Sequence, residues 1–144
     1  MKVGIEPHHL GVEMVWEDPE AFYGHCVGPG WVPHLLSLTA KLEKLGWDGK
    51  LRQVKEKFGT LRFYWTNNIP GIMGEIAEDV VSHYEERTAY ICEECGEFGE
   101  LRYGGWTKCL CTKHNKERIA RNKTDEPEQE CGCRETFECE AHRA

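Results

Sequence analysis

The chain has 144 residues, of which 40% are hydrophobic and 30% are charged, and its formal net charge at pH 7 is -7. This length allows one domain with a modest core, or one domain with a small appendage, and excludes two domains of ordinary size. No apolar run reaches the roughly 18 residues that a membrane-spanning helix needs, and the N-terminal residues lack the apolar centre of a signal peptide. We therefore expect a cytoplasmic protein with no membrane partner.

The N-terminal 25 residues hold short apolar clusters and predict a short strand or extended segment. His8 and His9 are interpreted as exposed polar residues, which is the usual role of two adjacent histidines. A reducing cytoplasm favours metal ligation or free thiols over disulfides for the eight cysteines. Cys26 is isolated from the others, and we interpret it as a small buried hydrophobic residue, although His25 adjoins it.

Residues 31–46 predict an amphipathic helix. Its leucines recur at three- and four-residue steps, at Leu35, Leu38, Leu42 and Leu45. Pro33 suits the first turn and Gly46 ends the run, so the apolar stripe is expected to lie against the sheet that follows.

That sheet is predicted as a β-hairpin, in which residues 50–56 pair with a strand of alternating pattern around Leu61, Phe63 and Trp65, and Gly59 forms the turn. Residues 26–66 are net basic in an otherwise acidic chain. Three cations flank the turn and are expected to converge on one edge as a docking surface for an acidic partner or a phosphate. These are Lys55, Lys57 and Arg62.

A second amphipathic helix is predicted to begin after Pro70-Gly71. Its apolar positions are Ile72, Met73, Ile76, Ala77, Val80, Val81 and Tyr84. Its other face is acidic, and we interpret that face as a solvated surface. The acidic residues are Glu75, Glu78, Asp79, Glu85 and Glu86.

The strongest motif follows this helix. Cys92 and Cys95 are two residues apart, fifteen residues intervene, and Cys111 and His114 are again two residues apart. This is the two-knuckle spacing of a structural zinc ribbon. Cys109 competes with Cys111 as third ligand, and we favour Cys111 because it completes the second two-residue gap.

Two aromatic residues lie inside the ribbon. Tyr103 and Trp106 are expected to cover the metal site and join it to the core. An exposed Trp106 would instead be a candidate anchor for a partner.

Five segments together, GWVPHLLSL, VKEKFGTLRFYW, ICEECG, GGW and LCTKH, make residues 27–115 resemble a family of small proteins from bacteriophages and bacteria that has no established activity. The family is marked by a KEKFGxLRFY hairpin and a CxxC…CxxH ribbon. The resemblance implies a compact α+β domain with a zinc ribbon. The cysteine-rich tail departs from the family pattern.

Residues after His114 predict a short helix and then an acidic linker over 123–130. A second three-cysteine, one-histidine set follows, and we interpret it as a second zinc site whose folding energy comes from the metal. Its ligands are Cys131, Cys133, Cys139 and His142.

The sequence thus predicts an α+β fold in which a small hairpin packs against two amphipathic helices. Residues 1–122 form the domain, with the ribbon at about 90–115, and residues 131–144 form a zinc-binding tail. Two structural zinc ions are expected, because quartets of protein ligands leave no open position for substrate.

We therefore expect a noncatalytic binding protein. The family resemblance favours a phage-encoded protein that binds and modulates a host or defence protein. The alternative is a nucleic-acid binder that uses the basic hairpin with the aromatic residues Phe58, Tyr64 and Trp65. A nuclease of HNH type is a third candidate, suggested by His114-Asn115 beside the knuckle, but a histidine that binds zinc cannot serve the chemistry.

Overall fold

The computed structural model describes residues 2–5 and 14–125. The chain divides into two compact units, residues 1–114 and 115–144. The predicted α+β class is confirmed in the first unit, which holds two small sheets and three of the α-helices. Helix α4 (Thr112–Asp125) covers the predicted helix after His114.

The larger sheet has four strands in the order β2-β1-β3-β4. Strand β1 (Val3–Ile5) pairs antiparallel with β2 (Met14–Trp16) and parallel with β3 (Lys50–Lys57). Strand β3 pairs antiparallel with β4 (Thr60–Trp65), which confirms the predicted hairpin. Strand β4 therefore lies at one edge of the sheet.

The hairpin has a register shift between Leu51 and Gln53. The extra residue in β3 explains why Leu51 and Val54 are both buried although they are three positions apart, which breaks strict alternation. The two-residue loop consists of Phe58 and Gly59, whose φ angles are +55° and +84°. Positive φ at both positions is the requirement of a tight type I′ turn.

Three α-helices belong to the first unit: α1 (Pro19–Cys26), α2 (Val32–Leu45) and α3 (Gly71–Arg87). Helix α1 differs from the prediction of a short strand or extended segment over the N-terminal 25 residues. Pro19 occupies the first turn, and the Asp18 side chain accepts a hydrogen bond from the backbone N–H of Glu20. Helix α2 ends at Gly46, in the left-handed conformation with φ of +112°.

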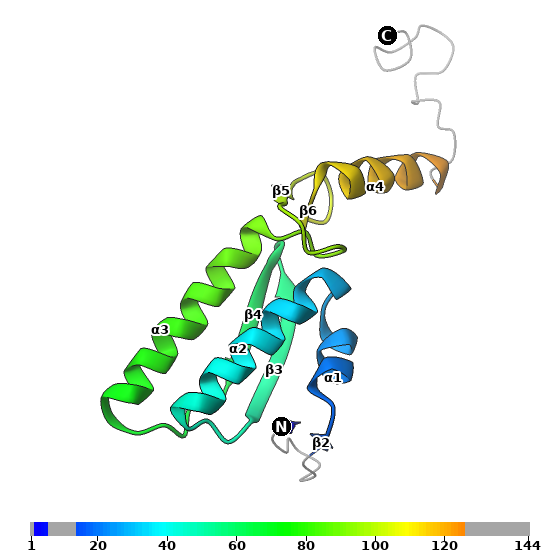
Figure 1. Ribbon diagram of the computed structural model, residues 1–144. Helices are drawn as coiled ribbons and strands as arrows, with labels where there is room; N and C mark the ends of the chain where they lie inside the picture. Colours follow the sequence, from blue (N-terminus) through cyan, green and yellow to red (C-terminus); the bar gives the residue numbers. More distant parts are fainter. Residues whose placement is uncertain (1, 6–13, 126–144) are drawn as a thin grey trace, which may run out of the picture. The chain divides into compact units, whose positions relative to one another are not determined.

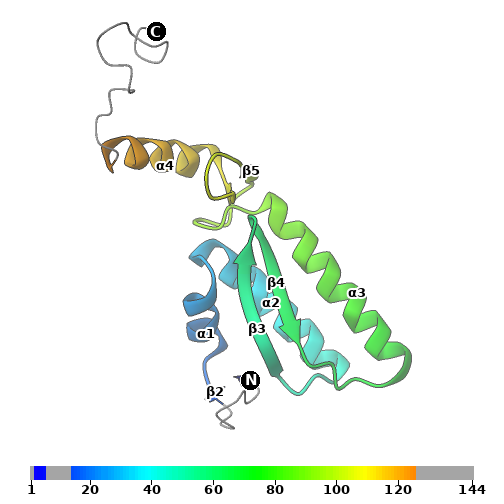
Figure 2. The same ribbon diagram turned by 180° about the vertical axis from the view of Figure 1, so that it is seen from behind.

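Helices α2 and α3 lie side by side on one face of the β3–β4 hairpin (Figure 1). Seen from behind, the hairpin lies in front of α2, and no helix of the described part of the chain covers this face of the hairpin (Figure 2). Apolar side chains from the helices and the inner hairpin face form one core, with Trp31, Leu35, Leu38 and Leu42 of the α2 region among its most buried members.

Helix α3 uses only part of its predicted apolar stripe. Ala77 and Val81 are buried, whereas Ile72 and Met73 are 69% and 46% exposed. The acidic face is also not uniformly solvated, because the half-buried Glu85 accepts a hydrogen bond from the backbone N–H of Phe63 at 2.8 Å. Glu85 therefore belongs to the contact between α3 and the edge strand.

The ribbon begins after a short 3-10 turn (Thr88–Tyr90) and contains the two-stranded sheet of β5 (Glu100–Arg102) and β6 (Lys108–Leu110). A second 3-10 turn, Pro29–Trp31, precedes α2. Among the described residues, no helix combines the length and the apolar character that a membrane span needs.

Candidate metal centre and hairpin surface

The four side chains of the first predicted quartet meet at one point. The ligand atoms of Cys92, Cys95, Cys111 and His114 all lie within 4.8 Å of one another. Cys92 is buried and Cys95 is exposed. The centre is therefore a Cys3His cluster that can hold one metal ion at the surface of the ribbon.

Three of the distances between ligand atoms agree with a tetrahedral site. Bonds of about 2.3 Å to sulfur and about 2.0–2.1 Å to nitrogen place two sulfur ligands about 3.8 Å apart, and a sulfur and a nitrogen about 3.5 Å apart. The Sγ atoms of Cys95 and Cys111 are 3.8 Å apart. His114 Nδ1 lies 3.6 Å from Cys92 Sγ and 3.2 Å from Cys111 Sγ. Nδ1 is thus the nitrogen that faces the cluster.

The second knuckle favours a thiolate at Cys111. This residue directly precedes α4, and the backbone N–H of His114 donates to its Sγ at 3.4 Å. That hydrogen bond is the main cause that lowers the pKa of Cys111 to about 6, and His114, Cys92 and Cys95 add to the effect. A thiolate is the form of cysteine that binds a metal.

Cys109 is outside the cluster. Its side chain is fully buried, and its Sγ donates to the carbonyl oxygen of Ala89 at 3.3 Å. Burial raises the pKa of Cys109 to about 12, so its thiol stays protonated and packs as part of the core. Cys26 is half-buried, and burial raises its pKa to about 11, which makes it a weak nucleophile.

The first knuckle is attached to the core by the segment before α2. The backbone N–H of Gly30 donates to the carbonyl of Glu93 at 2.7 Å, and Trp31 Nε1 donates to the carbonyl of Ile91 at 2.8 Å. A Cβ atom on Gly30 would lie 2.2 Å from the carbonyl oxygen of Cys92. No local sequence signal reveals this contact, because the partners lie about 60 positions later in the chain.

Glu93 completes this attachment from inside the protein. Its side chain is 4% exposed, and Oε2 accepts from the backbone N–H of Gly28 at 3.1 Å while Oε1 lies 3.6 Å from Lys108 Nζ. Burial raises its pKa, and the charge of Lys108 and the hydrogen bond from Gly28 oppose that shift. Glu93 thus links the knuckle, β6 and the turn before α2.

The three predicted cations lie on the face of the hairpin opposite the core, whereas the sequence analysis expected them at one edge. Lys55 on β3 pairs directly with Arg62 on β4, and Lys57 pairs with Thr60. None of the ion pairs between described residues involves Lys55, Lys57 or Arg62. We call this set the basic face.

Exposed aromatic rings occur in the hairpin loop next to the basic face and in the ribbon. Tyr103 and Trp106 are 74% and 70% exposed, so the expectation that they join the metal site to the core is wrong, and Trp106 meets the condition for the alternative, a candidate anchor for a partner. Trp106 Nε1 contacts Glu56 Oε1 at 3.4 Å, which ties its loop to the hairpin. Phe58 is 66% exposed, whereas Trp65 belongs to the core.

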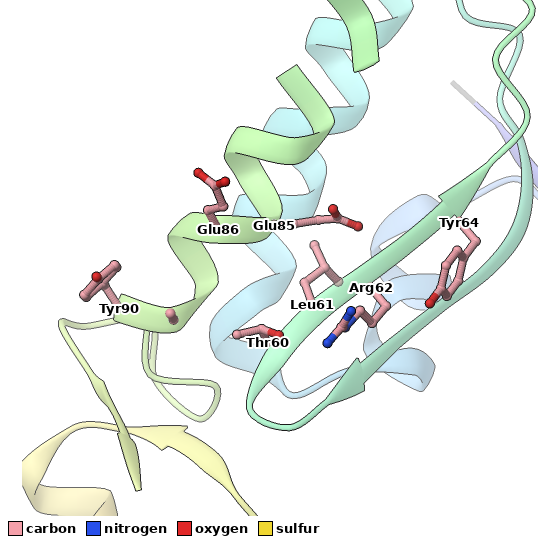
Figure 3. A pocket seen from close by; sticks show the side chains of 8 residues that line it. Thr60, Leu61, Arg62, Tyr64, Glu85, Glu86 and Tyr90 are labelled. Carbon is pink, nitrogen blue, oxygen red and sulfur yellow. The ribbon is translucent and has the colours of Figure 1, made fainter. Parts of the chain in front are cut away.

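A pocket of about 640 Å³ adjoins the basic face, between the edge of β4 and the C-terminal end of α3 (Figure 3). Its walls include Arg62 and Tyr64 from the strand and Glu85, Glu86 and Tyr90 from the helix side. Of the residues that line this pocket, the sequence predicted Arg62 as a site residue and Tyr64 as part of the nucleic-acid alternative. The sequence analysis interpreted the acidic face of this helix as a solvated surface. The contact between the helix and the strand edge joins distant segments, and local sequence patterns do not show it.

The remaining predicted site residues fall outside the described residues. These are the second quartet, Cys131, Cys133, Cys139 and His142. His8 and His9, which were interpreted as exposed polar residues, also lie outside the described residues. The second zinc site stays a prediction.

The fold and the cluster define an α+β protein with a Cys3His centre carried on two knuckles. Comparisons with protein-family models, with curated proteins and with solved structures give no match.

Proposed function

We propose that this protein is a noncatalytic binding module stabilised by zinc. The observation that carries the proposal is the Cys3His cluster, whose interatomic distances fit a tetrahedron made entirely of protein ligands. Such a site has no open position for water or substrate, and the ligand set of three sulfurs and one imidazole suits zinc.

The metal content of the purified full chain tests this proposal. Elemental analysis is expected to find zinc, and X-ray absorption is expected to find sulfur at about 2.3 Å. Two ions per chain are expected if the tail also binds. Absence of zinc after growth in zinc-supplemented medium would refute the proposal, and one ion, with Cys131, Cys133 and Cys139 open to alkylation, would remove only the second site.

The basic face is the binding surface in this proposal. Like charges directly opposite each other on paired strands destabilise a sheet, and Lys55 faces Arg62 in this way. An anionic group between the two side chains would relieve that repulsion. The arrangement therefore supports a partner that presents negative charge.

The resemblance of residues 27–115 to small phage and bacterial proteins leads us to include a phage origin and a host or defence protein as partner. Affinity capture from host cells followed by mass spectrometry tests this part. A variant with Lys55, Lys57 and Arg62 all changed to Glu is expected to keep its zinc and lose the partner, because none of the three side chains belongs to the hydrophobic core or to the metal cluster. Lys44→Glu on α2 is the control.

Nucleic-acid binding is the second candidate, and the exposed Phe58 and Tyr64 beside the cations favour it. An HNH-type nuclease has the least support. His114 Nδ1 faces the cysteine cluster, and a histidine engaged with the metal cannot act as the base.

A further inference from the structure

The pocket at the edge of β4 has walls of opposite charge. Figure 3 shows Arg62 and Tyr64 projecting from the same side of the strand, while Glu85 extends from α3 toward it. Arg62 and Glu85 are not paired in an ion contact, although the charge of Arg62 acts on the Glu85 carboxyl. A ligand that fills this pocket must therefore offer an anion on one side and hydrogen-bond donors on the other.

Arg62 has an unused hydrogen-bond donor that an anion could bind. Its Nε is buried and has no hydrogen-bond partner among the residues that the structure describes. A buried donor without a partner is unfavourable, and a guanidinium binds phosphate or carboxylate through paired N–H groups. Lys55, directly across the strand pair, adds a second positive charge at the same position.

Phe58, the aromatic residue next to Lys57, has an unfavourable backbone conformation. Phe58 has a φ angle of +55°, a conformation that a bulky side chain rarely adopts, and its ring is 66% exposed. Lys57 Nζ lies 5.5 Å from the centre of that ring. A strained and exposed phenylalanine is explained by a role in binding, since neither backbone preference nor burial favours it there.

We propose that the pocket and the basic face bind a single-stranded nucleic acid, with one phosphate on Arg62 and Lys55 and the neighbouring base stacked on Tyr64. The strand continues past Lys57, which takes a second phosphate, to a base stacked on Phe58. The carboxylate of Glu85, which extends toward the strand, accepts a hydrogen bond from a base amino group. This inference rests on the proposed use of the basic face for binding.

Two features favour a nucleic-acid strand over other anions. An acidic peptide would match Arg62 but would meet Glu85 and Glu86 in the same pocket, whereas a nucleotide combines an anion with amino donors. A free mononucleotide would leave Lys57 and Phe58 unused. Rows of cations interleaved with exposed aromatic rings are typical of proteins that bind single strands.

Fluorescence anisotropy with the full-length protein tests the inference. The probes are labelled 12-residue mixed-sequence DNA and RNA single strands, the matching duplexes and a mononucleotide, each at low and high salt. We expect binding of a single strand that is stronger than binding of the duplex, weakens with salt and is not competed by the mononucleotide at equal concentration.

The variants define the site. Arg62→Gln and Tyr64→Ala are expected to weaken binding about tenfold each, while Tyr64→Phe stays within about twofold because the ring is retained. Lys57→Gln should reduce the dependence of log K on log salt by about one. The matched controls are Lys44→Gln on α2 and the exposed ribbon residue Phe98→Ala, and both are expected to bind like the wild type.

Absence of single-strand binding at low salt in a zinc-loaded, folded protein would overturn the inference. So would equal losses in Arg62→Gln and Lys44→Gln, since binding would then be nonspecific. If a purified protein partner binds the wild type and not the charge-reversed variant while no oligonucleotide binds, the proposed function stands and only this inference fails.

Discussion

At the residue scale, Gly30 determines whether the metal-binding knuckle can reach the core. Its backbone N–H donates to Glu93, and its Cα leaves no room for a side chain against the carbonyl of Cys92. The carbonyl oxygen of Cys92 is a backbone atom, so it cannot move away from a new side chain without moving the ligand Cys92 itself. Because glycine has no side chain, the segment before α2 can lie against the metal-binding knuckle, and this contact joins the core to the metal site.

Replacing Gly30 by alanine tests whether the close contact with Cys92 excludes a side chain. Gly30→Ala is expected to lower the free energy of unfolding by about 2 kcal/mol or more and to speed zinc release to a chromogenic chelator. Gly24→Ala is the control, because no atom lies within 4 Å of the added Cβ and Ala favours the helix by about 1 kcal/mol. Equal stability of the two variants would contradict the proposed close contact.

His34 gives the first unit a pH dependence with a definite sign. Its Nε2–H donates to the carbonyl of Tyr84 at 2.9 Å, and burial, with smaller effects of Arg87 and His83, lowers its pKa below the usual 6.5. The unfolded chain therefore binds the proton more readily than the folded one. The stability that neutral His34 contributes is complete above pH 6.5 and is lost as the pH falls toward its folded pKa.

We expect the wild type to lose more stability than His34→Gln between pH 7.5 and pH 5.5 in chemical denaturation. Both proteins carry the same metal cluster, so its own pH dependence cancels in the difference. Parallel curves for the two proteins would show that His34 titrates equally in the folded and unfolded states. His25→Gln is the comparison, since His25 lies exposed on α1.

At the element scale, the β3–β4 hairpin combines an ordinary glycine with an unfavourable phenylalanine in its loop. Phe58→Asn is expected to raise the free energy of unfolding by about 0.5–1 kcal/mol, because Asn tolerates positive φ and little burial is lost. Thermal melting measures the effect. Tyr103→Asn, at an exposed ribbon position without positive φ, should bring no gain, and a destabilised Phe58→Asn would mean that the ring packs in solution.

Side chains at the C-terminal end of α3 and in the following 3-10 turn bind the backbone N–H groups along the edge of β4. Thr88 Oγ1 accepts from the backbone N–H of Leu61 at 2.9 Å and donates to the carbonyl of Glu85 at 2.6 Å. Thr88→Val keeps the shape but leaves a buried N–H without an acceptor, at a cost of about 1–3 kcal/mol in urea denaturation. Thr60→Val on the strand itself should cost less than half of that, because its hydroxyl lies nearer the surface.

These elements also show what the sequence can predict. Local periodicity predicted α2 and the hairpin, because the leucine spacing and the alternation around Phe63 each reflect one buried face. Ligand spacing predicted the four cluster residues, because two short gaps suffice to describe two knuckles. The Thr88 and Gly30 contacts join segments 27 to about 60 residues apart, and no local pattern encodes such pairs.

At the scale of the whole first unit, the core and the metal site are built from different parts of the chain. Apart from Cys109, every buried member of the main hydrophobic cluster comes from residues 3–81. The ribbon contributes few buried apolar side chains of its own, so its order depends on the metal and on the contacts around Gly30.

Removal of the metal is therefore expected to unfold the ribbon and leave the core in place. After treatment with a strong chelator, hydrogen exchange should become fast over residues 91–110, while α2 and β3 keep slow exchange because their apolar contacts do not involve the ligands. Cys92→Ser should behave like the metal-free protein, and Cys139→Ser should retain a protected ribbon, since the first cluster is intact. Fast exchange in α2 at the same chelator concentration would show that the core and the metal site form one cooperative unit instead.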